Sequence, residues 1–111
     1  MRETVGRPGF STSAVADDGR TVLAVFGEVD VATAPRLRDE LFQHLRAGPV
    51  VLDLAGLDFL DSSGVRVLSH ALRACHDEGL ELRVRPRLTD AVRQILEMTG
   101  MLAVLPMEDR P

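Results

Sequence analysis

The chain has 111 residues, of which 45% are apolar and 27% charged, and its formal net charge is −4. That length suffices for one hydrophobic core and is too short for two, and the composition is typical of a globular domain. An acidic chain has no basic field to hold nucleic-acid phosphates or an anionic membrane surface, so direct nucleic-acid or membrane binding is not expected.

The first half of the chain is predicted to form a β-hairpin followed by a helix. Residues 1–9 contain two glycines and a proline and are expected to be a flexible leader. Residues 10–15 and 21–26 flank an Asp-Asp-Gly turn signal, which predicts an antiparallel hairpin. A helix is predicted over residues 33–47, because Thr33 suits the N-cap, a proline suits the first turn, and Gly-Pro follows the last.

The second half alternates strands with helices. The strands are predicted at residues 50–54, 80–85 and 101–105. The helices are predicted at residues 63–77 and 89–98. The inward face of the first of these two helices is predicted to be Val65, Leu68, Leu72 and Cys75, which recur at helical spacing.

These elements define a single α/β domain over residues 10–106, with a frayed tail at residues 107–111. Its predicted architecture is a mixed sheet of four to five strands with helices packed against it. Each connection in the second half is longer than a dozen residues, so the later strands can pair in parallel.

The turn before the helix at residues 63–77 carries the most information. Asp61, Ser62, Ser63 and Gly64 stand at a helix N-terminus, beyond the carboxyl end of a buried strand, where partners tend to dock in α/β folds. Asp and Ser are also the preferred N-cap residues, so capping alone is one interpretation. Three polar residues exceed the need of one cap, and Gly64 is predicted to leave room for a partner to approach the backbone.

Residues 59–65, Phe-Leu-Asp-Ser-Ser-Gly-Val, preceded by Val-Leu-Asp-Leu at 51–54, resemble the hallmark segment of anti-sigma factor antagonists, the bacterial members of the STAS domain family. Gly-Glu-Val-Asp at 27–30 resembles the family's loop before its first helix. Residues 91–102 resemble its C-terminal helix and final strand. The resemblance covers residues 22–105 in matching order and spacing.

This resemblance implies a partner-switching protein. In that family the second serine of the tetrapeptide, here Ser63, is phosphorylated by a serine kinase that is also the anti-sigma factor; Ser62 is the second choice. The unphosphorylated antagonist binds the kinase and frees a sigma factor, phosphorylation breaks the complex, and a phosphatase restores it. ATP and magnesium then belong to the kinase, so no cofactor of this chain is expected.

The partner-binding residues are expected to be Asp30, Asp61, Ser62, Gly64 and Arg66. By resemblance, the loop of Asp30 lies near the phosphorylation turn, and an Asx-type cap before the first helix is an equally good explanation of this residue. Arg66 and Arg73 are expected on the outer side of their helix, where partner contact and ordinary solvated charge both fit.

A phosphate on Ser63 would add about −1.5 to −2 charges and three acceptor oxygens. A helix N-terminus favours such a charge, so the fold is expected to survive phosphorylation. The phosphate is therefore expected to act through its bulk and through repulsion from Asp61, Asp58 and acidic groups on the partner.

Catalysis by the chain itself is not expected. His70 lies two turns along the helix from Ser63, too far to deprotonate that hydroxyl directly, and there is no Gly-x-Ser-x-Gly elbow or metal-spaced His/Cys cluster. Cys75 is expected to be a core thiol. The sequence has no phosphate-cradling glycine-rich loop, which leaves only weak nucleotide binding open.

The expected location is the cytoplasm. A single cysteine allows no internal disulfide, and no apolar run has the length of a signal peptide core or of the roughly 20 residues that span a bilayer. A non-switching STAS scaffold or a transport-complex subunit is the alternative function; the intact serine pair argues against both. A monomer and a weak dimer fit the sequence equally well.

Overall fold

A computed structural model of the chain describes residues 3–7 and 9–109. The strands are β1 (Glu3–Arg7), β2 (Phe10–Asp17), β3 (Arg20–Val29), β4 (Val50–Asp53), β5 (Leu57–Leu60) and β6 (Leu82–Val84). The helices are α1 (Ala34–Ala47), α2 (Ser62–Glu78) and α3 (Asp90–Met98), followed by the 3₁₀ helix η1 (Met101–Ala103). The fold is therefore the predicted α/β domain with a mixed sheet.

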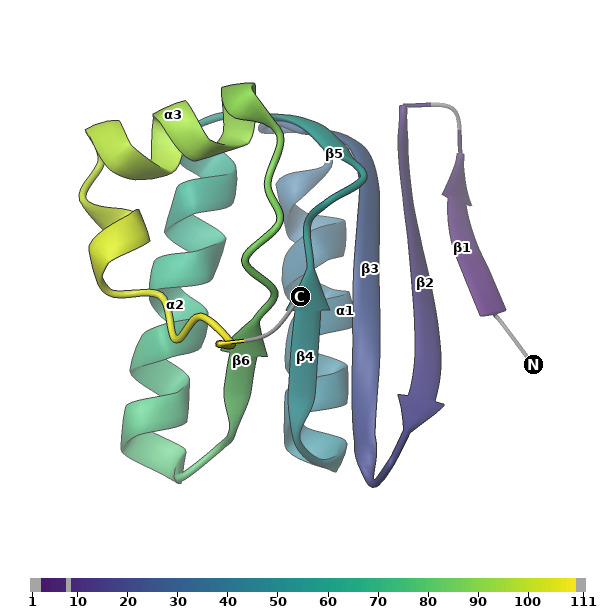
Figure 1. The fold of residues 1–111 in the computed structure, drawn as a ribbon. Helices are drawn as coiled ribbons and strands as arrows, with labels where there is room; N and C mark the ends of the chain where they lie inside the picture. The colour runs from purple at the N-terminus through teal and green to yellow at the C-terminus, as the bar shows by residue number, and fades with distance from the viewer. Residues whose placement is uncertain (1–2, 8, 110–111) are drawn as a thin grey trace.

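Within the described residues the sheet has six strands, in the order β1-β2-β3-β4-β6, and β5 pairs with β3. The first three strands are antiparallel, whereas β3, β4 and β6 are parallel neighbours. Figure 1 shows α1 and α2 side by side on one face of this sheet, with α3 across one end. Parallel pairing follows from the helical crossovers, since α1 connects β3 to β4 and α2 leads from β5 to β6.

The predicted hairpin is confirmed as β2 and β3, which pair from Phe10–Gly27 to Asp17–Arg20. Its two-residue turn places Asp18 and Gly19 at φ values of 52° and 80°. Positive φ at both central residues defines the turn type whose twist matches that of paired strands, and Asp-Gly is a preferred sequence for it.

The core lies between the sheet and the two long helices. From the sheet it takes buried aliphatic residues, which include Leu23, Val25, Val50 and Leu52. From the helices it takes Leu37, Leu41, Phe42, Leu45, Val67, Leu68, Ala71 and Ala74. On α2 the predicted inward face is only partly right, because Val65, Leu72 and Cys75 are partly buried at the margin of the core. The small Ala71 and Ala74 are more deeply buried and suit close packing of α2.

Three segments differ from the prediction, and the sheet accordingly has six strands where four to five were expected. The expected leader includes β1, which pairs with β2 and satisfies backbone groups along that edge. The expected turn before α2 includes β5, which pairs with the long strand β3 beyond the end of β4. The expected last strand is instead the helix η1 and the turn after it, where the Leu105 N–H donates to the Met101 carbonyl at 3.0 Å and both side chains are buried.

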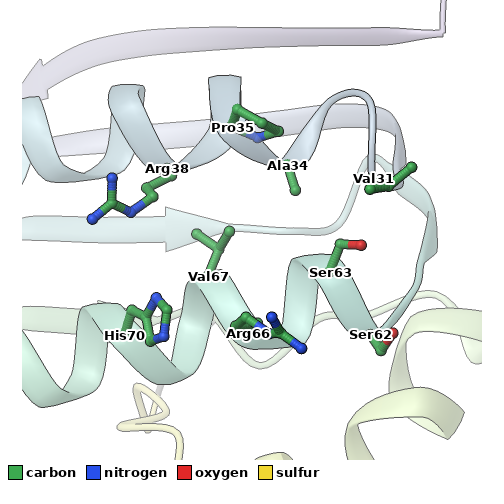
Figure 2. Close-up of a pocket in the computed structure, with 9 residues that line it drawn as sticks. All are labelled: Val31, Ala34, Pro35, Arg38, Ser62, Ser63, Arg66, Val67 and His70. Carbon is green, nitrogen blue, oxygen red and sulfur yellow. The ribbon is translucent and has the colours of Figure 1, made fainter.

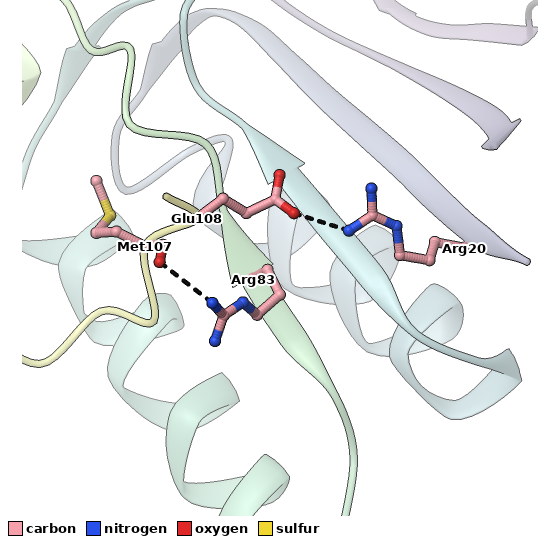
Figure 3. A network of polar contacts seen from close by, with 4 residues as sticks. All are labelled: Arg20, Arg83, Met107 and Glu108. Carbon is pink, nitrogen blue, oxygen red and sulfur yellow. Dashed lines mark hydrogen bonds and ion pairs between the residues drawn. The ribbon is translucent and has the colours of Figure 1, made fainter. Parts of the chain in front are cut away.

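The predicted frayed tail, residues 107–111, is held against β6 in its first part (Figure 3). The Glu108 backbone N–H donates to the Val84 carbonyl at 2.8 Å. The Glu108 carboxylate pairs with Arg20 Nη1 at 2.7 Å. Arg83 Nη2 donates to the Met107 carbonyl at 3.4 Å. The segment thus covers an otherwise open edge of the sheet, and the last two residues lie outside the described part.

Candidate functional site

The turn at residues 61–64 begins helix α2, as predicted. Asp61 is the N-cap, and its Oδ1 accepts the backbone N–H groups of Ser63 at 2.8 Å and Gly64 at 3.4 Å. These are two of the N–H groups that a helix leaves unpaired at its start. The Asp61 N–H donates to the Val29 carbonyl at 3.1 Å, which fixes the turn to the end of β3. Capping therefore accounts for Asp61 and uses neither serine hydroxyl.

The two serines border an open groove between α1 and α2 (Figure 2). The groove has a volume of about 520 Å³ and is lined by Val31, Ala34, Pro35, Arg38, Ser62, Ser63, Arg66, Val67 and His70. Ser63 is half-buried, and Figure 2 shows its hydroxyl directed toward the loop before α1. Ser62 is exposed at the end of the groove. Within the described residues neither hydroxyl has a hydrogen-bond partner, so both are available to a second molecule.

Asp30 forms an Asx-type turn in the loop between β3 and α1. Its Oδ1 accepts the N–H groups of Ala32 at 2.9 Å and Thr33 at 3.1 Å. Thr33 Oγ1 accepts the Asp30 N–H at 2.9 Å and donates to the Glu28 carbonyl at 3.0 Å. The structural interpretation of Asp30 is thus confirmed. Thr33 occupies the predicted N-cap position but uses its hydroxyl to close the loop and not to cap a helical N–H.

The loop of Asp30 does lie beside the turn at residues 61–64. Its next residue, Val31, lines the same groove as Ser62 and Ser63 and is 78% exposed. An exposed valine at the mouth of a groove presents apolar surface to a partner. No local pattern singles out Val31, because its place at the groove depends on the packing of its loop beside the start of α2.

Gly64 faces the core, and the prediction that it leaves room for a partner is wrong. The residue is buried, and a β-carbon there would overlap Leu60 Cδ1 and lie 2.8 Å from Val29 Cγ1. The missing side chain instead lets the first turn of α2 pack against the ends of β3 and β5. Gly64 therefore supports the turn from inside.

Arg66 lines the groove and is exposed, and Figure 2 shows its guanidinium leaning along α2 toward the serines. Arg73 is also exposed but does not line this groove. Sequence reasoning missed that Arg38 of α1 and His70 of α2 line this groove, at the end away from the serines (Figure 2). No local signal marks these two positions, because they line one groove only through the packing of α1 beside α2.

Cys75 lies outside this groove. Cys75 is partly buried against the core, and burial, with Glu78 nearby, raises the pKa of its thiol. In the described part of the chain no three His, Cys, Asp or Glu side chains are placed to hold a metal ion. No helix among these residues has the length and apolar character needed to cross a membrane.

Comparison with known proteins agrees with this architecture. Residues 11–110 match the STAS domain model, so the chain belongs to the STAS domain family. The anti-sigma F factor antagonist of Paenibacillus polymyxa is 30% identical over 94 residues, which cover 82% of this chain and 80% of that protein. The anti-sigma-F factor antagonist RsfA of Mycobacterium tuberculosis is 31% identical, over 81% of this chain and 73% of its own length.

A solved structure gives the same picture. The crystal structure of an anti-sigma factor antagonist from Mycobacterium paratuberculosis matches with a TM-score of 0.79 and 28% identity, over 95% of this chain and 91% of that one. The resemblance identified from residues 22–105 is thereby confirmed for the family and the fold.

Proposed function

We propose that this chain is an anti-sigma factor antagonist that works by partner switching. In its unphosphorylated form it binds an anti-sigma factor serine kinase and so frees a sigma factor. Phosphorylation of Ser63 by that kinase ends the complex, and a phosphatase restores it. Membership of the STAS domain family and the names of the relatives support the general role. The observation that carries the switch is the Ser63 hydroxyl, which points toward the groove at the start of α2 and has no hydrogen-bond partner among the described residues.

The geometry favours Ser63 over Ser62 as the acceptor that matters. In the part of the chain that the structure describes, neither hydroxyl has a hydrogen-bond partner, so a kinase would not have to break the fold to reach either. The Ser63 side chain, however, is half-buried beside the groove, whereas Ser62 is exposed. A phosphate on Ser63 would therefore stand where a bound partner must lie, and one on Ser62 would extend into solvent.

The phosphate should alter this surface and not the fold. Because Asp61 Oδ1 already accepts the N–H groups of Ser63 and Gly64, the phosphate has no need to displace the cap. It adds about −1.5 to −2 charges next to the carboxylate of Asp61 and fills part of the groove. Both effects act on an approaching partner, which makes this a surface switch.

The direct test is phosphate transfer followed by mass spectrometry. Wild type, Ser62→Ala and Ser63→Ala are incubated with the candidate anti-sigma factor kinase, ATP and magnesium. One phosphate is expected on wild type and on Ser62→Ala and none on Ser63→Ala. If the phosphate were missing only from Ser62→Ala, the assignment of Ser63 as the acceptor would be overturned. The absence of phosphate from wild type, with kinase binding unaffected by ATP, would favour a non-switching STAS scaffold.

A further inference from the structure

The groove between α1 and α2 differs in charge from the chain as a whole. The chain carries a net charge of −4, yet none of the nine residues that line the groove is acidic. Its ionisable members are Arg38, Arg66 and His70. A basic groove on an acidic protein selects strongly for an acidic ligand, because the rest of the surface repels that ligand from other sites.

The two arginines of the groove have no ion-pair partner in the residues that the structure describes. Among the described residues neither Arg38 nor Arg66 forms an ion pair, whereas Arg20, Arg46 and Arg85 each do. The Arg38 guanidinium lies over the ring of the buried Phe42, 5.2 Å from its centroid. This stacking holds the cation in place without consuming its charge. Both guanidinium groups therefore keep their donors for a carboxylate of another molecule.

The rest of the groove is apolar, which defines the ligand further. Val31, Ala34, Pro35 and Val67 all line it, and Val31 and Pro35 are exposed. A small free anion would leave this apolar surface uncovered. A segment of folded protein that carries both carboxylates and apolar side chains would satisfy both parts of the groove.

We infer that this groove receives an acidic, amphipathic segment of the anti-sigma factor, with carboxylates on Arg38 and Arg66 and apolar side chains against Val31 and Pro35. The inference rests on the proposed function, since it specifies the chemistry of that partner. Arg38 is thereby assigned a role in binding that its sequence context did not indicate.

The same arrangement explains how a phosphate on Ser63 would end binding. Figure 2 shows the Arg66 guanidinium directed toward the serine end of the groove, one helical turn from Ser63. A phosphate there supplies the kind of anion that Arg66 would otherwise take from the partner, and it does so within the molecule. The phosphate also repels the partner's carboxylates. The acidic segment therefore loses its contact with Arg66 and meets a negative charge in the groove.

Charge reversal in the groove tests this inference. Binding of the anti-sigma factor is measured by calorimetry for wild type, Arg38→Glu, Arg66→Glu and the matched control Arg73→Glu, which is exposed on α2 outside the groove. Each groove variant is expected to weaken binding about tenfold or more, and the control to change it less than about threefold. Wild-type affinity should fall between about 0.05 and about 0.3 M salt, and the Arg38→Glu/Arg66→Glu double variant should lose most of this dependence.

The outcomes separate the inference from the proposed function. If wild type fails to bind the anti-sigma factor, the proposed function is overturned, and the inference with it. If wild type binds and the groove variants match the Arg73→Glu control, only the inference is overturned. The same holds if the variants change self-association of the chain and leave partner binding intact. Circular dichroism of Arg38→Gln and Arg66→Gln checks that the fold is kept. Both variants should lose binding affinity, but less than the corresponding Glu variants.

Discussion

The turns that begin α1 and α2 are built on the same device and use it differently. In each, one carboxylate oxygen of an aspartate, Asp30 or Asp61, accepts two backbone N–H groups. Before α1 the accompanying hydroxyl, that of Thr33, both accepts and donates a hydrogen bond. Before α2 the hydroxyls of Ser62 and Ser63 make none within the described residues.

This difference distinguishes the polar groups that the fold requires from the polar groups that it does not use. The turn before α1 is closed on itself, and removing any of its polar atoms leaves a partner unsatisfied. The turn before α2 is complete with the Asp61 carboxylate and the small Gly64 alone. Its two serine hydroxyls contribute no hydrogen bond to the turn, so the simplest account of them is a role toward another molecule.

The largest stability effect is expected at Gly64, the buried member of the α2 turn. Gly64→Val places a branched side chain against Leu60 and Val29, which are 2% and 0% exposed and cannot move aside freely. Overpacking of this kind costs about 1–3 kcal/mol, and we expect about 3 kcal/mol of unfolding free energy in a urea titration.

The matched control is Ser62→Val in the same turn, at an exposed position, for which a change within about 0.5 kcal/mol is expected. Equal losses in the two variants would mean that Gly64 is not packed against the sheet. If Gly64 faced a partner, as the sequence predicts, Gly64→Val would keep wild-type stability and lose only kinase binding.

The two aspartates come next and test whether the turns share one device. Asp61→Ala removes the acceptor of two helical N–H groups, and Asp30→Ala removes the acceptor of two loop N–H groups. Loss of such a cap costs about 0.5–2 kcal/mol, so similar losses of about 1 kcal/mol are expected in both, measured by thermal unfolding. A loss confined to one variant would break the comparison.

Much of this fold is readable from local pattern, and the departures have tertiary causes. The hairpin and all three helices follow from periodicity and end signals close to their observed bounds. Strand β5 was missed because Leu57 and Leu60 are buried with an exposed pair between them, which is not the alternation of a strand. It forms because β3 extends beyond β4 and offers it a partner.

The local motifs of the site could be predicted from the sequence, but the tertiary contacts that assemble the groove could not. The turn at residues 61–64 and the loop of Asp30 carry local signals, and the structure does bring them together. Arg38 and His70 carry none, because each is an ordinary exposed position until α1 and α2 pack side by side. The sequence also could not show that Gly64 faces the core, because a glycine allows close approach of either a partner or the core.

Removing a single hydroxyl is expected to cost at most about 1 kcal/mol, and it tests the comparison most directly. Thr33→Val keeps the shape of the side chain but leaves the Asp30 N–H without its 2.9 Å acceptor, for a loss of about 1 kcal/mol in urea unfolding. Ser63→Ala removes a hydroxyl that has no hydrogen-bond partner among the described residues, and it should change stability by less than about 0.5 kcal/mol. If Ser63→Ala were the more destabilised of the two, its hydroxyl would have a structural role.

The smallest stability effect is expected for Ser63→Asp, which places a negative charge at the phosphate position. A carboxylate in the first turn of α2 gains about 0.3–1 kcal/mol from the helix dipole. Repulsion from the neighbouring carboxylate of Asp61 offsets this gain by a similar amount, since Asp61 already occupies the Ser63 and Gly64 N–H groups. The melting temperature should therefore stay within about 3 °C of wild type, while kinase binding is lost. A fall of about 10 °C or more would mean that charge at this position acts on the fold, and a stable variant that still binds would mean that charge alone does not operate the switch.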